Sequence, residues 1–61
     1  MKIEYDPKSD ALYVRLNEKT ILESEQIRPG IILDYDAEGN VSGIEVLSAS
    51  KFETVPLKKA A

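Results

Sequence analysis

The sequence contains no cysteine, no histidine and no tryptophan among its 61 residues. These absences exclude disulfides, thiolate or imidazole metal sites, Cys or His nucleophiles and any catalytic triad. No stretch approaches the roughly 20 apolar residues of a membrane span. Residues 1–6 contain no apolar signal-peptide segment. We therefore expect a cytoplasmic, non-enzymatic protein that needs no cofactor.

The charge is too acidic and too dispersed for generic binding to nucleic acid. Eight Lys and Arg stand against eleven Asp and Glu, which gives a net charge of -3. Phosphate binding needs clustered basic side chains, whereas Arg15, Arg28 and Lys51 are scattered along the chain. The expected partner is therefore a protein, and neither nucleic acid nor a membrane.

The chain is short for a stable core of its own, although 43% of its residues are apolar. Burying about 60% of the unfolded surface yields on the order of 90 kcal/mol. Ordering the chain at about 1.5 kcal/mol per residue costs a similar amount. The near-zero difference suggests that a second copy or a partner supplies further burial.

Alternation of polar and apolar residues predicts strands in most of the sequence. Segment 20–28 is ambiguous: its charged pattern favours an edge strand with a bulge, but a helix over 21–26 is also compatible with propensity. Gly39 lies where a hairpin turn needs a positive φ. The other strands are predicted at residues 2–5, 11–16, 30–36 and 41–47, with turns at 6–10, 17–19 and 37–40.

The C-terminal part shows a capping box, from Ser50 to Glu53, that predicts a short helix. Pro56 limits this helix to one or two turns, and residues 57–61 are expected to fray. Phe52, Val55 and Leu57 are expected to pack on the sheet. Residues 1–61 are thus predicted to form one mainly β domain, an antiparallel meander of four to five strands with a small helical element.

Apolar residues lie on both faces of the strand that begins at Gly30. Ile32 shares one face with Asp34. The other face carries Ile31, Leu33 and Tyr35, so a second copy or the C-terminal segment must cover one side. Tyr13 points away from the face of Leu12 and Val14. The predicted interface residues are Tyr13, Ile31, Leu33, Tyr35 and Phe52.

The most acidic segment, residues 34–45, has the spacing of a twelve-residue calcium loop. However, strands are predicted on both sides of it, where an EF-hand requires helices. An acidic β-hairpin without a metal is therefore the favoured interpretation. The paired carboxylates are also weak evidence for a hydrolase, because the sequence shows no substrate cleft. The candidate calcium ligands are Asp34, Asp36, Glu38, Asn40 and Glu45.

Three sequence blocks stand in a recognisable order. The blocks are Tyr5-Asp6-Pro7-x-x-Asp10-Ala11-Leu12-Tyr13-x-Arg15-Leu16, Pro29-Gly30-x-Ile32-Leu33-Asp34-Tyr35-Asp36-x-x-Gly39 and Gly43-Ile44-Glu45-x-Leu47-x-Ala49-Ser50. Together they resemble the small bacterial domain-of-unknown-function family 2283, over roughly residues 3–51. The resemblance implies a compact β-meander in a cytoplasmic protein, without assigned catalytic or binding residues. Some relatives resemble the antitoxin half of toxin–antitoxin pairs, which implies a protein partner.

Two functions from different classes remain open at this point. The first is an interaction module that forms a homodimer or binds one protein partner, with an antitoxin-like role as a special case. The alternative is a small-ligand or divalent-ion binder that uses the acidic hairpin of residues 34–45. Association of the pure protein and calcium titration would discriminate between them.

Overall fold

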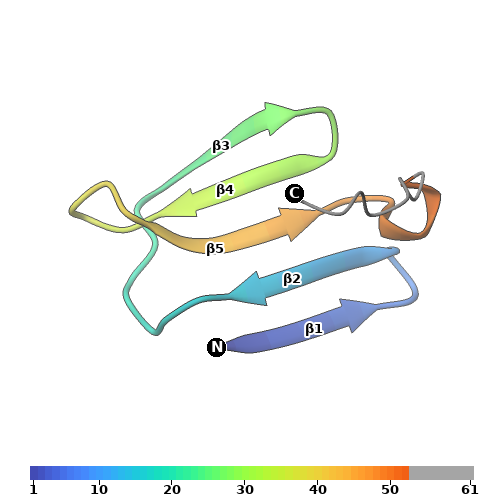
Figure 1. The fold of residues 1–61 in the computed structure, drawn as a ribbon, viewed down its shortest axis with the longest axis horizontal. Helices are drawn as coiled ribbons and strands as arrows, with labels where there is room; N and C mark the ends of the chain where they lie inside the picture. Colours follow the sequence, from blue (N-terminus) through green and yellow to red (C-terminus); the bar gives the residue numbers. More distant parts are fainter. Residues whose placement is uncertain (53–61) are drawn as a thin grey trace, which may run out of the picture.

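A computed structural model describes residues 1–52 of the chain. It contains one five-stranded antiparallel sheet with the strand order β1-β2-β5-β4-β3 (Figure 1). This confirms the mainly β prediction. The elements are β1 (Lys2–Asp6), β2 (Ala11–Arg15), β3 (Glu23–Arg28), β4 (Ile31–Tyr35), β5 (Val41–Val46) and a 3-10 turn η1 (Ala49–Lys51).

The strand order departs from a simple up-and-down succession. β5 inserts between β2 and β4, so the connection over residues 16–22 carries the chain from β2 to the far edge of the sheet (Figure 1). Backbone hydrogen bonds fix both ends of this connection: Leu16 N–H donates to Ser42 O at 2.9 Å, and Leu22 N–H donates to Tyr35 O at 2.8 Å. The central strand β5 is therefore paired on both sides.

The ambiguous segment is an edge strand rather than a helix. β3 pairs with β4, and the register shifts between Gln26 and Arg28 as the predicted bulge requires. A helix would have to bury one of its faces, but every residue of β3 is exposed. In this segment the alternation of charged residues was therefore a better predictor of structure than helix propensity.

The turns use local side-chain hydrogen bonds and a positive φ, as their residues predict. The Asp6 carboxylate accepts from Lys8 N–H at 3.0 Å and from Ser9 Oγ–H at 2.9 Å. Gly39 has a φ of 81°, a conformation that side chains with a Cβ rarely adopt. These turns set the register of the two hairpins.

The capping-box prediction was wrong for the described residues. The chain forms a 3-10 turn there, with Ser48 at its N-cap in a left-handed conformation, and Ser50 lies inside the turn. The Ser50 hydroxyl donates to Asp10 Oδ2 at 2.7 Å, so it bonds the β1–β2 turn rather than a helix of its own. Glu53, Val55 and Leu57 lie outside the described residues.

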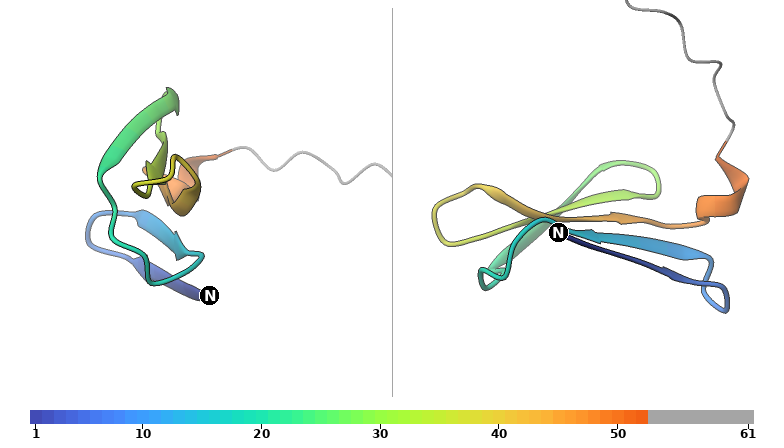
Figure 2. Two further views of the ribbon diagram at one scale, coloured as in Figure 1. Left: turned by 90° about the vertical axis from the view of Figure 1, so that its left-hand side faces the viewer. Right: turned by 60° about the horizontal axis from the view of Figure 1, so that its bottom comes forward.

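The sheet is a twisted single layer. Figure 2 shows no other described element stacked on either face of it. Among residues 1–52, no hydrophobic side chain is buried, and the only buried side chains are Asp34, Asp36 and Ser42. Residues 1–52 form a single layer, so they do not enclose the usual place for an apolar core, which lies between two layers.

Candidate functional site

The apolar residues at alternate positions of four strands lie together on one face of the sheet. Cross-strand partners point to the same side, so the register aligns Ile3 with Val14, Val14 with Ile44, and Ile44 with Leu33. A second row aligns Tyr5, Leu12, Val46 and Ile31 in the same way. We call this surface the apolar face: Ile3, Tyr5, Leu12, Val14, Ile31, Leu33, Tyr35, Ile44 and Val46.

The apolar face remains accessible to solvent in the chain described. Ile3 is 63% exposed and Tyr5 49% exposed at the β1 edge. The residues on β2, β4 and β5 are half-buried, because neighbouring strands cover their flanks but no layer covers their tips. Charge appears only at the opposite edge, where Glu25 pairs with Leu33 and Arg28 pairs with Ile31.

The opposite face has a polar centre built around Gly43. The Tyr13 ring lies so close to this residue that a Cβ at Gly43 would stand 2.8 Å from the phenol oxygen. Arg15 Nη1 donates to the same oxygen at 3.2 Å, while its other nitrogens donate to the carbonyls of Asn17 and Lys19. Glycine is therefore needed here for space, not for a positive φ.

A buried carboxylate adjoins this tyrosine. Asp34 is 2% exposed and accepts from Ser24 Oγ–H at 2.6 Å. Its Oδ2 would lie 3.1 Å from a Cβ at Gly43. A hydrogen bond with Asp34, burial and the charge of Asp34 raise the pKa of Glu45. The buried Asp34 carboxylate therefore disfavours the charged form of Glu45.

The β4–β5 hairpin is organised by Asp36. Its Oδ1 accepts from Glu38 N–H at 2.9 Å and from Asn40 N–H at 3.0 Å. Those backbone bonds, that to Asn40 foremost, lower the pKa of Asp36. Lys19 lies 4.0 Å from Asp36 Oδ2 and 3.3 Å from Glu38 Oε1. The Asp36 carboxylate therefore stabilises the hairpin turn by accepting hydrogen bonds from its backbone.

The candidate calcium ligands do not gather around one point. Asp34 lies on the polar face with Ser24 and Glu45, whereas Asp36 faces the hairpin backbone. Glu38 is exposed and contacts Lys19. Within residues 1–52, no group of three or more acidic side chains is placed to hold a metal ion.

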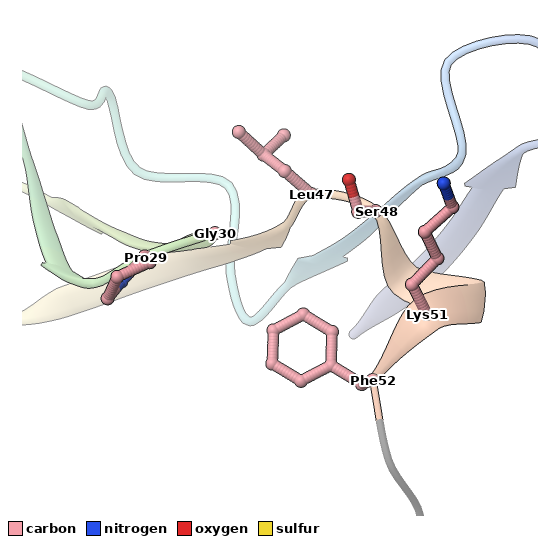
Figure 3. Close-up of a pocket in the computed structure, with 6 residues that line it drawn as sticks. All are labelled: Pro29, Gly30, Leu47, Ser48, Lys51 and Phe52. Atoms are coloured by element: carbon pink, nitrogen blue, oxygen red, sulfur yellow. The ribbon is translucent and has the colours of Figure 1, made fainter.

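The predicted interface residues separate into three places. Ile31, Leu33 and Tyr35 lie together on the apolar face. Tyr13 lies on the polar face, where it is engaged with Gly43 and Arg15. Phe52 is 44% exposed beside Gly30, at an open hollow of about 430 Å³ beyond the ends of β4 and β5 (Figure 3).

Sequence reasoning missed the partners that Gly43 brings together. Ser24 and Arg15 were not recognised as part of a polar cluster, because the sequence alone does not give the strand register that sets them beside Asp34 and Gly43. The available signal was a glycine inside a strand, which often marks the close approach of another group. The burial of Asp34 could have been predicted, because this carboxylate shares a face with Ile32 on a largely apolar strand.

The fold and its surfaces define a small single-sheet β domain with one polar and one apolar face. The sequence profile of the family described as "Protein of unknown function (DUF2283)" matches residues 2–50. The chain belongs to this family, as the three sequence blocks indicate. No curated protein and no solved structure shows a significant match to the chain. Within residues 1–52, no helix has the length and apolar character to span a membrane.

Proposed function

We propose that this domain is a non-enzymatic protein-interaction module that works through its apolar face. The observation that supports the proposal is the combination of an in-phase apolar surface with the lack of any buried hydrophobic side chain among residues 1–52. Soluble monomers rarely leave a contiguous apolar surface of this kind uncovered. A protein that covers it would complete the missing second layer of the fold.

The gain from such coverage is large for a domain of this size. Fully burying an aliphatic side chain stabilises by about 1.5–3 kcal/mol, so completing the burial of a half-buried one contributes roughly 1 kcal/mol. The aliphatic residues of the apolar face thus offer roughly 7 kcal/mol on this chain alone. A matching apolar surface on the partner would add a similar amount, against an association cost of about 4–15 kcal/mol.

The alternative function, ion binding by the 34–45 hairpin, has less support. Asp36 uses Oδ1 to close the turn, and Asp34 is bonded to Ser24 and Glu45 on the polar face. Calcium would have to break these hydrogen bonds and rearrange the hairpin. Calorimetric titration with millimolar calcium tests this alternative, and saturable heat that is lost in Asp34→Asn would favour it.

Native mass spectrometry of the protein isolated gently from its host tests the interaction module. The wild type is expected in a stoichiometric protein complex, with itself or with a different protein. Ile31→Glu places a charge on the apolar face and should abolish the complex, while Glu4→Lys on the opposite side of β1 should preserve it. Circular dichroism of both variants separates loss of binding from loss of folding.

The proposal fails if the wild type is a bare, cooperatively folded monomer whose stability does not depend on protein concentration. It also fails if Ile31→Glu keeps the complex intact. A complex with a different, basic protein would favour the antitoxin-like form of the module, because the chain is acidic and charge complementarity favours such a pair.

A further inference from the structure

We propose that the partner covering the apolar face is a second copy of this chain, so that two sheets pack face to face into a ten-stranded sandwich. This inference rests on the proposed function and names its partner. Ile44 would lie at the centre of the contact. It sits on the middle strand β5, in the middle row of the register, between Val14 and Leu33.

The chain's own C-terminal residues bring too little apolar surface to cover the face. Residues 53–61 read Glu-Thr-Val-Pro-Leu-Lys-Lys-Ala-Ala, and Val55 and Leu57 are the only large aliphatic residues among them. The apolar face presents three strands of half-buried aliphatic residues and the exposed Ile3 at its edge. A second copy carries a sheet of the same extent whose apolar face is equally exposed, so two copies can cover each other.

The size of the face suits a small dimer. Five strands about 4.8 Å apart, each about five residues long at 3.4 Å per residue, give a flat footprint of about 400 Å². Two facing sheets therefore remove about 800 Å² before the relief of the side chains is counted. The exposed Leu16, which continues the alternation of Leu12 and Val14 just after β2, extends the contact toward the roughly 1,200 Å² of specific interfaces.

The charges of the face are compatible with two-fold pairing. Glu25 and Arg28 both lie on the edge strand β3, and the centre of the face is uncharged. A two-fold axis through Ile44 and across the strands brings Arg28 over Glu23 of the other copy. An axis along the strands brings it over Tyr5, whose hydroxyl donates to Asp10 at 2.6 Å. Either arrangement places Arg28 near a carboxylate of the other copy.

The lack of cysteine makes a clean test possible with single-cysteine variants. Ile44→Cys puts a thiol on the apolar face, and Glu45→Cys puts one on the polar face of the same strand. The two positions are matched, because both wild-type residues are half-buried. Each purified cysteine variant is alkylated with iodoacetamide at protein concentrations from about 1 µM to about 500 µM. The oligomeric state of the wild type is measured over the same range by sedimentation velocity.

We expect the wild type to sediment as a dimer at the upper concentrations. Alkylation of Ile44→Cys should slow at least tenfold across the range, while alkylation of Glu45→Cys should not change. A wild type that stays monomeric throughout, with equal behaviour of the two thiols, overturns the dimer. If that monomer nevertheless occurs in a complex in the host that Ile31→Glu abolishes, only the identity of the partner is wrong and the interaction module stands.

Discussion

Replacing Gly43 by alanine tests whether the polar face is packed as tightly as the structure shows. Alanine is ordinarily the better strand residue, by about 0.5–1 kcal/mol. Here its Cβ would meet the Tyr13 hydroxyl oxygen at 2.8 Å, Asp34 Oδ2 at 3.1 Å and Tyr13 Cε1 at 3.2 Å. Carbon contacts are most favourable near 3.5–4.0 Å, so each of these neighbours must move.

Neither neighbour of Gly43 is free to move without loss. Tyr13 is held by the hydrogen bond from Arg15, and the Asp34 carboxylate is held by Ser24 at 2.6 Å. Overpacking of this kind costs about 1–3 kcal/mol. Subtracting the strand preference of alanine leaves a net loss of about 0–2.5 kcal/mol, centred near 1 kcal/mol, with a fall in Tm of about 4–8 °C for each kcal/mol.

Urea denaturation at a fixed protein concentration measures this loss in wild-type and Tyr13→Phe backgrounds. Removing the phenol oxygen removes the shortest contact, so Gly43→Ala should cost less in the Tyr13→Phe protein. Gly39→Ala is the matched control. Its Cβ would meet nothing within 4 Å, and its cost comes only from a φ of 81°. The reasoning is refuted if Gly43→Ala is as stable as the wild type, or if its cost is equal in both backgrounds.

Three further predictions concern the carboxylates. Glu45→Gln should raise the free energy of unfolding at pH 7 by up to about 1 kcal/mol. Because the pKa of Glu45 is raised in the folded state, the wild type loses stability as pH rises from the ordinary glutamate range through the folded pKa. The stabilities of the wild type and Glu45→Gln should therefore converge in acid. Thermal melts from pH 4 to pH 8 would show this convergence. Asp36→Ala should lower Tm by several degrees and Asp36→Asn by less, because asparagine keeps an acceptor for the Glu38 and Asn40 amides; equal losses would contradict that role. Hydrogen bonds from Tyr5 and Ser50 lower the pKa of Asp10, so the stability that they give is present above the ordinary aspartate pKa and is lost as pH falls through the folded value. The Ser50 amide resonance in NMR spectra should therefore shift with an inflection below pH 3.8, and Tyr5→Phe should move that inflection upward.

The contrast between β3 and the C-terminal turn shows how far the sequence alone could be interpreted. The edge strand and its bulge were predictable because charged residues alternate with period two, which is a local property. The capping box at Ser50 was misleading because the same serine found an acceptor 40 positions away, at Asp10. A local motif fails when a distant residue competes for its hydrogen bonds.

The sequence by itself determined four of the five strands, the turns between them and the two opposite faces, and it favoured the fifth strand over a helix. Alternation and turn residues act between near neighbours, so they specify local structure without knowledge of the rest of the chain. It also determined that Ile31, Leu33 and Tyr35 share a side. The family resemblance came from the same local patterns, since the turn residues and strand alternation make up the three blocks.

Only the tertiary structure decided which strands are neighbours and what each face contains. The insertion of β5 between β2 and β4 depends on pairing between residues remote in sequence, which no local pattern fixes. That insertion brings Tyr13, Gly43 and Asp34 together on one side and aligns Val14, Ile44 and Leu33 on the other. Residues 1–52 form one sheet only, so they supply no second layer that could cover the apolar face.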